Sequence, residues 1–387
     1  MKMLPYARQF IDENDISAVV ETLQSDFLTQ GPKVSAFEEK LRQYCHATHA
    51  VVVNSATSAL HLACLAIGLG PKDWLWTSPI SFLASANCAR YCRAKVDFVD
   101  IDPNTYNMSV QALEEKLIQA KTRNQLPKVV VPVHLAGQSC EMRQMKALSE
   151  EFGFYIIEDA AHAVGSRYEN EPVGNCRYSD MTVFSFHPAK VMTTAEGGAV
   201  LTQQKSLADK IRILSSQGVT RELVDMQGPS HGPWYYQMVE LGFNFRMNDI
   251  QATLGINQLD KLDTFVEKRN QIAKKYAQAL EGLPLILPYQ RPDTFSAWHL
   301  FIICLDPIKT EQSRKEAFIK LRERGIGVNV HFIPIHTQPY YQKLGFQWGD
   351  FPLAEQYYER CMTLPIYFGL TEDEQSNVIQ AVSEVLS

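Results

Sequence analysis

The first 250 residues alternate between short apolar strand patterns and amphipathic helical patterns. Val51–Asn54 is a short apolar run, and the residues after it repeat at the spacing of one helical face. Glu141–Glu151 and Ser206–Ser216 have the same helical spacing. Further strands are predicted at Lys95–Ile101, Lys128–His134, Phe154–Glu158, Met181–Phe186 and Gly198–Thr202. This alternation predicts an α/β fold whose largely parallel sheet is covered by helices on both faces.

The last third of the chain has a different pattern. One long helical pattern runs over 248–280, and a proline-rich linker follows over 282–291. After the linker we expect a strand, a helix, a second strand and two C-terminal helices, the first three at Ala297–Leu305, Glu311–Arg324 and Gly327–Ile333. We therefore expect an N-terminal arm (1–30), a large domain (31–247), a linking helix (248–281) and a small α+β domain (282–387).

Composition excludes several classes of protein. The 387 residues carry a net charge of −6, which does not suit a nucleic-acid partner. No run of about 18 apolar residues predicts a membrane span, and the first residues do not resemble an export signal. The eight cysteines are scattered without a metal-binding spacing, so free thiols in the cytoplasm, and no metal, are expected.

Asn54–Ser58 is the first candidate site. It joins a strand end to a helix start through small residues, and free amides at such a helix start favour phosphate. Taken alone, the segment is better explained as an ordinary helix cap.

Asp159 is the second candidate. It follows Glu158 at the end of an apolar strand, where ligands of open α/β sheets bind. A carboxylate there can hold the proton of a cationic ring nitrogen. The alternative is a capping aspartate, and His162 nearby would by itself more often be structural.

Lys190 is the third candidate. It follows a buried strand in a loop of small and apolar residues, where lysine is unusual. Burial lowers the pKa of an amine and makes it nucleophilic towards an aldehyde. By itself a surface lysine would be the simpler interpretation. Together, however, a phosphate seat, a carboxylate for a pyridinium and a reactive amine are what pyridoxal 5′-phosphate requires.

Six stretches of the chain resemble, in order, the sugar aminotransferases named after DegT, DnrJ, EryC and StrS. They are DFLTQGPKVSAFE (26–38), NSATSALHLA (54–63), SPISFLASAN (78–87), EDAAHAVGS (158–166), FSFHPAKVMTTAEGG (184–198) and GFNFRMNDIQATLGINQLDKL (242–262). The resemblance implies the aspartate-aminotransferase fold (type I) of pyridoxal phosphate enzymes.

The resemblance also implies roles for single residues. Lys190 matches the lysine that bonds to the coenzyme aldehyde and then moves protons, and Asp159 matches the partner of the ring nitrogen. Phe82 matches the aromatic side chain that stacks on the ring, and His162 matches a position, often Gln, near its phenolic oxygen. The implied phosphate contacts are Ala56, Thr57, Ser58 and Ser185, with Asn244 reaching across from a neighbouring subunit. That last contact implies a homodimer with shared active sites.

Substrate contacts follow from the same resemblance. Those implied are Tyr6, Asp26, Phe27, Leu28 and Thr29 of the arm, together with His299, Leu300, Phe301 and His331. For Phe301, a place in the core of the small domain is the stronger alternative.

A narrower resemblance, to members that act in pseudaminic acid biosynthesis, rests on SDFLTQGPK, SFHPAK with TTAEGG, and VHFIPIHTQPYY. It implies transfer of the amino group of L-glutamate to C4 of UDP-2-acetamido-2,6-dideoxy-β-L-arabino-hex-4-ulose. The alternatives are another 4-keto or 3-keto nucleotide sugar and a non-catalytic, regulatory member. Retention of Lys190 argues against the regulatory alternative and against relatives that carry His there and act as dehydratases.

Overall fold

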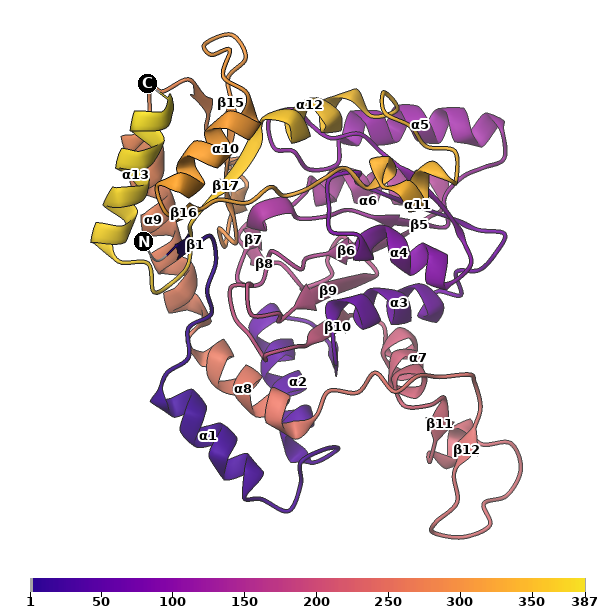
Figure 1. Ribbon diagram of the computed structural model, residues 1–387. Helices are drawn as coiled ribbons and strands as arrows, with labels where there is room; N and C mark the ends of the chain where they lie inside the picture. Colours follow the sequence, from indigo (N-terminus) through magenta and orange to yellow (C-terminus); the bar gives the residue numbers. More distant parts are fainter. Residues whose placement is uncertain (1–2, 387) are drawn as a thin grey trace.

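The computed structural model describes residues 3–386, which surround a central seven-stranded sheet (Figure 1). The strand order is β2-β10-β9-β6-β5-β3-β4, and β10 alone runs antiparallel to its neighbours. The strands are β2 (His49–Val53), β3 (Trp74–Thr77), β4 (Lys95–Phe98), β5 (Val129–Val131), β6 (Tyr155–Asp159), β9 (Met181–Ser185) and β10 (Gly198–Thr202). The predicted α/β class with a mainly parallel sheet is confirmed.

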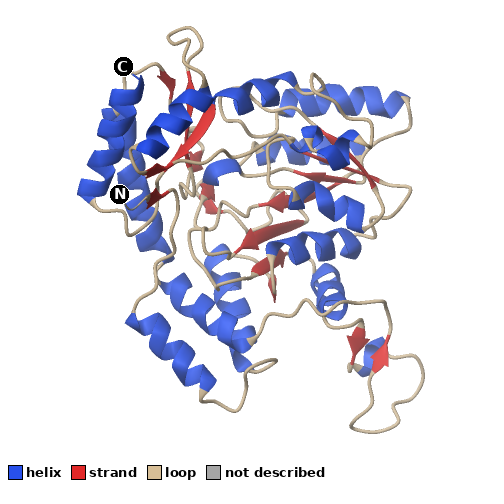
Figure 2. Cartoon of the chain, in the orientation of Figure 1, coloured by secondary structure: helices blue, strands red, loops and turns tan. Residues whose placement is uncertain are grey.

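The strands are mostly apolar, with residues of both alternating sets buried in apolar clusters, so helices cover both faces of the sheet (Figure 2). Val129 and Val131 pack on one face, and Val130 packs on the other. The first face carries α3 (Ala56–Ala66), α4 (Ala84–Tyr91) and α7 (Lys205–Ser215). The second carries α2 (Pro32–Cys45), α5 (Val110–Thr122), α6 (Met142–Phe152) and α8 (Asp249–Asp260).

The single helix expected over 248–281 is two helices, α8 and α9 (Leu262–Ala279). At Lys261 the backbone has φ −101° and ψ −4°, which interrupts the helical geometry between them. Helix α8 packs against α2 and α1 (Glu13–Leu23), whereas α9 continues into the core of the small domain. The connection between the domains is therefore α9.

The small domain has its own apolar core, which includes Phe301, Met362 and Val382. Its three-stranded sheet has the order β13-β15-β17, and α10 and α13 pack beside it. The third strand was not predicted, because it is only four residues long and directly follows a helix. These elements are β13 (Leu285–Ile286), β15 (Phe301–Leu305), β17 (Cys361–Leu364), α10 (Arg314–Glu323) and α13 (Glu372–Leu386).

Two predicted strands are shorter in the structure. The strand expected from Ala297 begins at Phe301, because Trp298 has a positive φ of 47° and the amide of Leu300 donates to Ala136 O. The strand expected over 327–333 is reduced to β16 (Ile326–Gly327), which pairs with β1 (Leu4–Pro5). The start of the N-terminal arm is therefore joined to the small domain.

After β16 the chain crosses back to the large domain. This segment contains α12 (Pro352–Arg360). Tyr341, which lies earlier in the same segment, donates from its Oη to Asn87 Oδ1 at 2.7 Å. The other elements of the crossing segment are η3 (Ile335–Thr337) and α11 (Pro339–Gln342). Part of the C-terminal third thus packs in the core of the large domain.

A hairpin of β11 (Val219–Thr220) and β12 (Gln237–Met238) projects from the lower right of the molecule (Figure 1). The remaining short elements are β7 (Arg167–Tyr168), β8 (Glu171–Pro172), β14 (Thr294–Phe295), η1 (Leu135–Gly137) and η2 (Leu223–Asp225). Within residues 3–386, none of the helices combines the length and apolar character needed to span a bilayer.

Candidate active site

A cavity of about 530 Å³ lies where the carboxyl ends of the parallel strands meet the small domain. Its lining includes Ala56, Thr57, Phe82, Asp159, His162, Ser185 and Lys190 from the large domain, and Tyr6, His299 and His331 from the other side. A larger groove of about 720 Å³ runs along α9, but it gathers none of these residues. The smaller cavity is therefore the candidate active site.

Asp159 is the last residue of β6, and strand alternation turns its side chain to the face covered by α3 and α4. The carboxylate is buried and accepts two hydrogen bonds. Ser85 Oγ donates to Oδ2 at 2.5 Å, and the amide of Ala161 donates to Oδ1 at 3.2 Å. These donors stabilise a buried negative charge at the bottom of the cavity.

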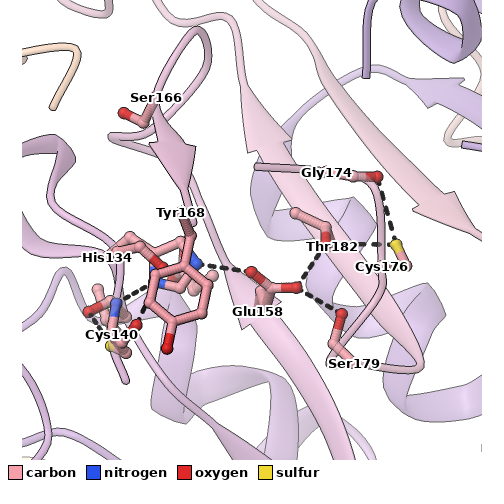
Figure 3. A network of polar contacts seen from close by, with 12 residues as sticks. His134, Cys140, Glu158, Ser166, Tyr168, Gly174, Cys176, Ser179 and Thr182 are labelled. Carbon is pink, nitrogen blue, oxygen red and sulfur yellow. Dashed lines mark hydrogen bonds and ion pairs between the residues drawn. The ribbon is translucent and has the colours of Figure 1, made fainter. Parts of the chain in front are cut away.

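Glu158 points to the opposite face of the same strand, into a second polar network (Figure 3). It contacts His134 Nε2 at 2.6 Å and accepts hydrogen bonds from Ser179 Oγ at 2.5 Å and Thr182 Oγ1 at 3.0 Å. Burial opposes ionisation, but these contacts, led by His134, hold the pKa of Glu158 below its usual value. The network joins the end of β6 to His134, which follows β5, and to Thr182 in β9, on the face of the sheet opposite the cavity.

Lys190 lies five residues beyond β9, in a turn where its amide donates to His187 O at 2.9 Å. Burial lowers the pKa of its ammonium group to about 8, although the negative charge of Asp159 acts in the opposite direction. An amine with this pKa is partly neutral near pH 7, which a nucleophile towards an aldehyde requires.

Three buried histidines line the cavity near Lys190: His162, His299 and His331. Burial is the main cause that lowers all three pKa values, that of His331 to about 3, and the positive charge of Lys190 adds to it. The three rings are therefore neutral at physiological pH. His162 Nδ1 accepts from the amide of Ala136 at 3.3 Å, so its other nitrogen carries the proton.

The start of α3 forms one end of the cavity. Ser55 Oγ caps the helix by accepting from the amide of Ser58 at 3.1 Å. The amides of Ala56 and Thr57 precede the first intrahelical hydrogen bond and remain for a ligand. A Cβ atom at Gly198 would lie 2.6 Å from the nitrogen of Ala56, so only glycine lets β10 approach this close. This arrangement suits a phosphate group.

Several residues predicted for the site lie outside this cavity. Leu300 and Phe301 are buried in apolar cores, because the chain turns after His299 to enter β15. Ser58 is buried and its hydroxyl accepts from Ser55 Oγ at 3.1 Å, and Asn244 forms a backbone bridge to Ser216. Asp26, Phe27, Leu28 and Thr29 precede α2, where Leu28 O accepts from the amide of Asp249.

Other residues that line the cavity were not singled out from the sequence. They are Ser81, His187, Glu196, Asn329 and Phe332, besides several apolar neighbours. His187 and Glu196 belong to the stretch that carries Lys190, and Asn329 and Phe332 flank His331. Their nearness to known motifs was a signal, but only the fold shows which of them face the cavity.

The model of the DegT/DnrJ/EryC1/StrS aminotransferase family matches residues 9–383 of this chain. The chain belongs to this family. It is therefore a sugar aminotransferase, and the resemblance inferred from its motifs is confirmed.

Several proteins are similar to this aminotransferase along nearly their whole length. The spore coat polysaccharide biosynthesis protein SpsC of Bacillus subtilis is 41% identical over 386 residues, 99% of this chain and 97% of that protein. The UDP-4-amino-4,6-dideoxy-N-acetyl-β-L-altrosamine transaminase of Campylobacter jejuni is 39% identical over 368 residues, 94% and 93% of the two chains. The structure of Helicobacter pylori PseC, an aminotransferase in pseudoaminic acid biosynthesis, superposes with a TM-score of 0.89 at 31% identity, covering 100% and 99%.

Enzymes of this family use pyridoxal 5′-phosphate, and similar chains are known in the PLP and PMP forms. The cavity of this aminotransferase fits that coenzyme. It offers helix-start amides at one end, a buried carboxylate with fixed donors, and an amine of lowered pKa. When bound, the coenzyme supplies the aldehyde carbon to which the amino group is transferred and a ring that accepts electrons from the substrate carbon.

Proposed function

We propose that this aminotransferase moves the amino group of L-glutamate to C4 of UDP-2-acetamido-2,6-dideoxy-β-L-arabino-hex-4-ulose. The product would be UDP-4-amino-4,6-dideoxy-N-acetyl-β-L-altrosamine, a precursor of pseudaminic acid. The observation that carries the reaction type is the placement of Lys190 and Asp159 in one cavity with the start of α3. The substrate is supported by the similarity to the Campylobacter jejuni and Helicobacter pylori enzymes.

Six residues of the cavity have proposed contacts with the coenzyme. Asp159 keeps the proton on the ring nitrogen of the coenzyme, and Phe82, whose side chain is 60% exposed, covers a ring face. Ala56, Thr57 and Ser185 hold the phosphate. The Nε2–H of His162 donates to the phenolic oxygen, which is the task that Gln would perform in relatives.

Lys190 is the acid–base group in both half-reactions. It removes the proton from the α-carbon of glutamate in the first, and it delivers a proton to C4 of the sugar in the second. Its lowered pKa suits both directions, because neither the protonated nor the neutral form is rare near pH 8. The neutral histidines around it leave the amine without a competing positive charge.

Tyr6, His299 and His331 are proposed as contacts to the sugar nucleotide. The Tyr6 ring lies 5.1 Å from the His331 ring, and His331 Nδ1 contacts Thr363 Oγ1 at 2.8 Å. His299 lines the same cavity, and its Nδ1 is buried without a hydrogen-bond partner among the described residues.

A homodimer with shared active sites is also proposed. Asn244 and Asp26–Thr29 would then reach the cavity of the partner rather than their own. The projecting β11–β12 hairpin supports this, because its apolar side chains are strongly exposed in one chain, Val224 by 88% and Trp234 by 73%. If variants Lys190→Ala and Asn244→Ala are each inactive, mixed dimers should regain activity. No regain would contradict shared sites.

The eight cysteines support a cytoplasmic location, because all are buried and none forms a disulfide. Small molecules are the proposed partners besides the second subunit.

The substrate is tested by incubating the purified enzyme with glutamate and a panel of keto sugar nucleotides. The panel should contain UDP- and dTDP-linked 4-keto and 3-keto sugars, and products are identified by mass spectrometry. We expect amination of the UDP-linked 4-keto-6-deoxy-HexNAc with the highest kcat/KM. A higher value for another sugar would favour the alternative substrate. No amination of any sugar would favour a regulatory member.

A further inference from the structure

We infer that Ser85 is a positioning residue for the reaction, and that Ser81 assists it. The inference rests on the proposed role of Asp159 and concerns how that carboxylate is held. Ser85 Oγ lies 2.5 Å from Asp159 Oδ2 and 2.6 Å from Ser81 Oγ, and both serines are buried. The two hydroxyls therefore form a chain of hydrogen bonds that ends on the carboxylate.

The direction of this chain follows from its last member. An ionised carboxylate can only accept hydrogen bonds, so the Ser85 hydroxyl gives it its one proton. Ser85 Oγ must then accept in its contact with Ser81, whose hydroxyl is the donor. A hydroxyl that accepts from another donates more strongly, so Ser81 strengthens the bond between Ser85 and Asp159.

The carboxylate needs these donors because of where it lies. Asp159 is 4% exposed, and an ionised carboxylate at such a depth is costly unless hydrogen bonds satisfy it. Among the described residues its donors are Ser85 on Oδ2 and the amide of Ala161 on Oδ1. With one oxygen held on each side, the plane of the carboxylate is fixed before any ligand arrives.

One short segment places both serines. Ser85 is the second residue of α4 and Ser81 lies three residues before the helix begins, and the bend between them brings their hydroxyls to 2.6 Å. Phe82, between them, is 60% exposed and lines the cavity. Residues 81–85 thus place both Phe82, the side chain proposed to stack on the coenzyme ring, and the serine that orients the Asp159 carboxylate.

The test compares the holoenzyme variants Ser85→Ala, Ser81→Ala and Ser85→Thr with Asp159→Asn. Ser149→Ala is the matched control, because Ser149 is a buried helical serine whose hydroxyl donates to Phe154 O, far from the cavity. Four quantities are measured: kcat, the KM of the sugar nucleotide, the dissociation constant of pyridoxal phosphate, and the pH dependence of the absorbance of the bound coenzyme. The thermal midpoint is recorded for each variant.

We expect Ser85→Ala to lower kcat by roughly tenfold to a hundredfold, the effect of one hydrogen bond to a charged group, with an unchanged sugar KM. It should weaken coenzyme binding and shift the absorbance profile in the direction of Asp159→Asn. Ser81→Ala should act in the same direction but less, and Ser85→Thr should restore the absorbance profile.

The inference is overturned if Ser85→Ala has the kcat and absorbance profile of Ser149→Ala, whatever happens to its thermal midpoint. Should Ser85→Ala fail to fold, an absorbance profile of Ser81→Ala equal to that of the control would overturn it instead. A normal profile for Asp159→Asn would refute the proposed role of Asp159 itself, and that outcome is distinct from a failure at Ser85 alone.

Discussion

The two walls of the cavity are built in different ways. One wall, which we call the coenzyme wall after its proposed role, consists of Ala56, Thr57, Asp159, Ser185 and Lys190, which lie at or just beyond strand ends of one sheet. The opposite wall, which we call the substrate wall after the role proposed for Tyr6, His299 and His331, also includes Asn329 and Phe332, and its residues lie on loops next to short strands of the small domain.

The substrate wall is held in place by hydrogen bonds between distant parts of the chain. Tyr357 Oη donates to His331 O at 2.5 Å, and the amide of Ile335 donates to Pro79 O at 2.9 Å. The coenzyme wall instead depends on the sheet itself, where β6 is fixed on both faces. This difference suggests that the reaction type is set by a rigid part of the fold, whereas the choice of sugar depends on loops that can vary.

The largest effect is expected from Lys190→Ala, which removes the acid–base group from the coenzyme wall. Turnover should fall by at least about 10⁴-fold, while the coenzyme and the sugar nucleotide still bind. Calorimetry measures binding of the sugar nucleotide. If turnover stops while binding is retained, the substitution has affected the coenzyme wall and left the substrate wall intact. Lys205→Ala, at an exposed lysine on α7, is the control. Normal turnover of Lys190→Ala would refute the assignment.

Asp159→Asn should reduce kcat by about 10³-fold, because the ring nitrogen loses its proton when its charged partner is removed. The fold should stay intact, since the amide can still bond to Ser85 and Ala161 in part. Steady-state kinetics and circular dichroism measure the two effects. Unchanged kinetics would remove Asp159 from the coenzyme wall.

Glu158→Ala tests whether the coenzyme wall is rigid because of the network behind it. The change leaves His134 buried without its partner and should lower the free energy of unfolding by about 3 kcal/mol. Chemical denaturation measures the loss, with Glu150→Ala at an exposed helical glutamate as the control. A loss no larger than in the control would show that the network does not hold β6.

The variants His299→Ala and His331→Ala address the substrate wall. Each should raise the KM of the sugar nucleotide by about tenfold, the effect of one lost hydrogen bond, with coenzyme affinity unchanged. The double variant is decisive: an unchanged sugar KM would exclude both histidines as substrate contacts.

The smallest effect concerns pH. Because burial lowers the pKa of Lys190 to about 8, the neutral amine becomes more abundant as the pH rises through that value. The rate at which the apoenzyme takes up pyridoxal phosphate should therefore rise about fivefold between pH 7 and pH 8 and level off above pH 9. A flat profile over this range would contradict a lowered pKa.

Much of the coenzyme wall could be predicted because its residues are local to strong patterns. Asp159 and Lys190 follow apolar strands, and a parallel sheet brings such strand ends to one edge. That rule predicts a shared location without any knowledge of distant contacts. The placement of Ser85 below Asp159 could not be predicted, because it depends on how far α4 lies from β6.

The substrate wall was harder to predict for a physical reason. Residues 297–301 read as one apolar strand, yet the positive φ of Trp298 turns His299 into the cavity and Phe301 into the small-domain core. Nothing in the local sequence indicates this turn. The local sequence does not indicate the break at Lys261 either, because the apolar spacing continues through it. The break lets α8 pack in the core of the large domain and α9 extend into the core of the small domain.

The central claim is that Lys190 is the amine that bonds to the aldehyde of the coenzyme. Treating the holoenzyme with borohydride fixes that bond, and mass spectrometry of the digested protein locates it. The account predicts one labelled peptide, with the coenzyme on Lys190. A label on another side chain, or no label, would contradict it.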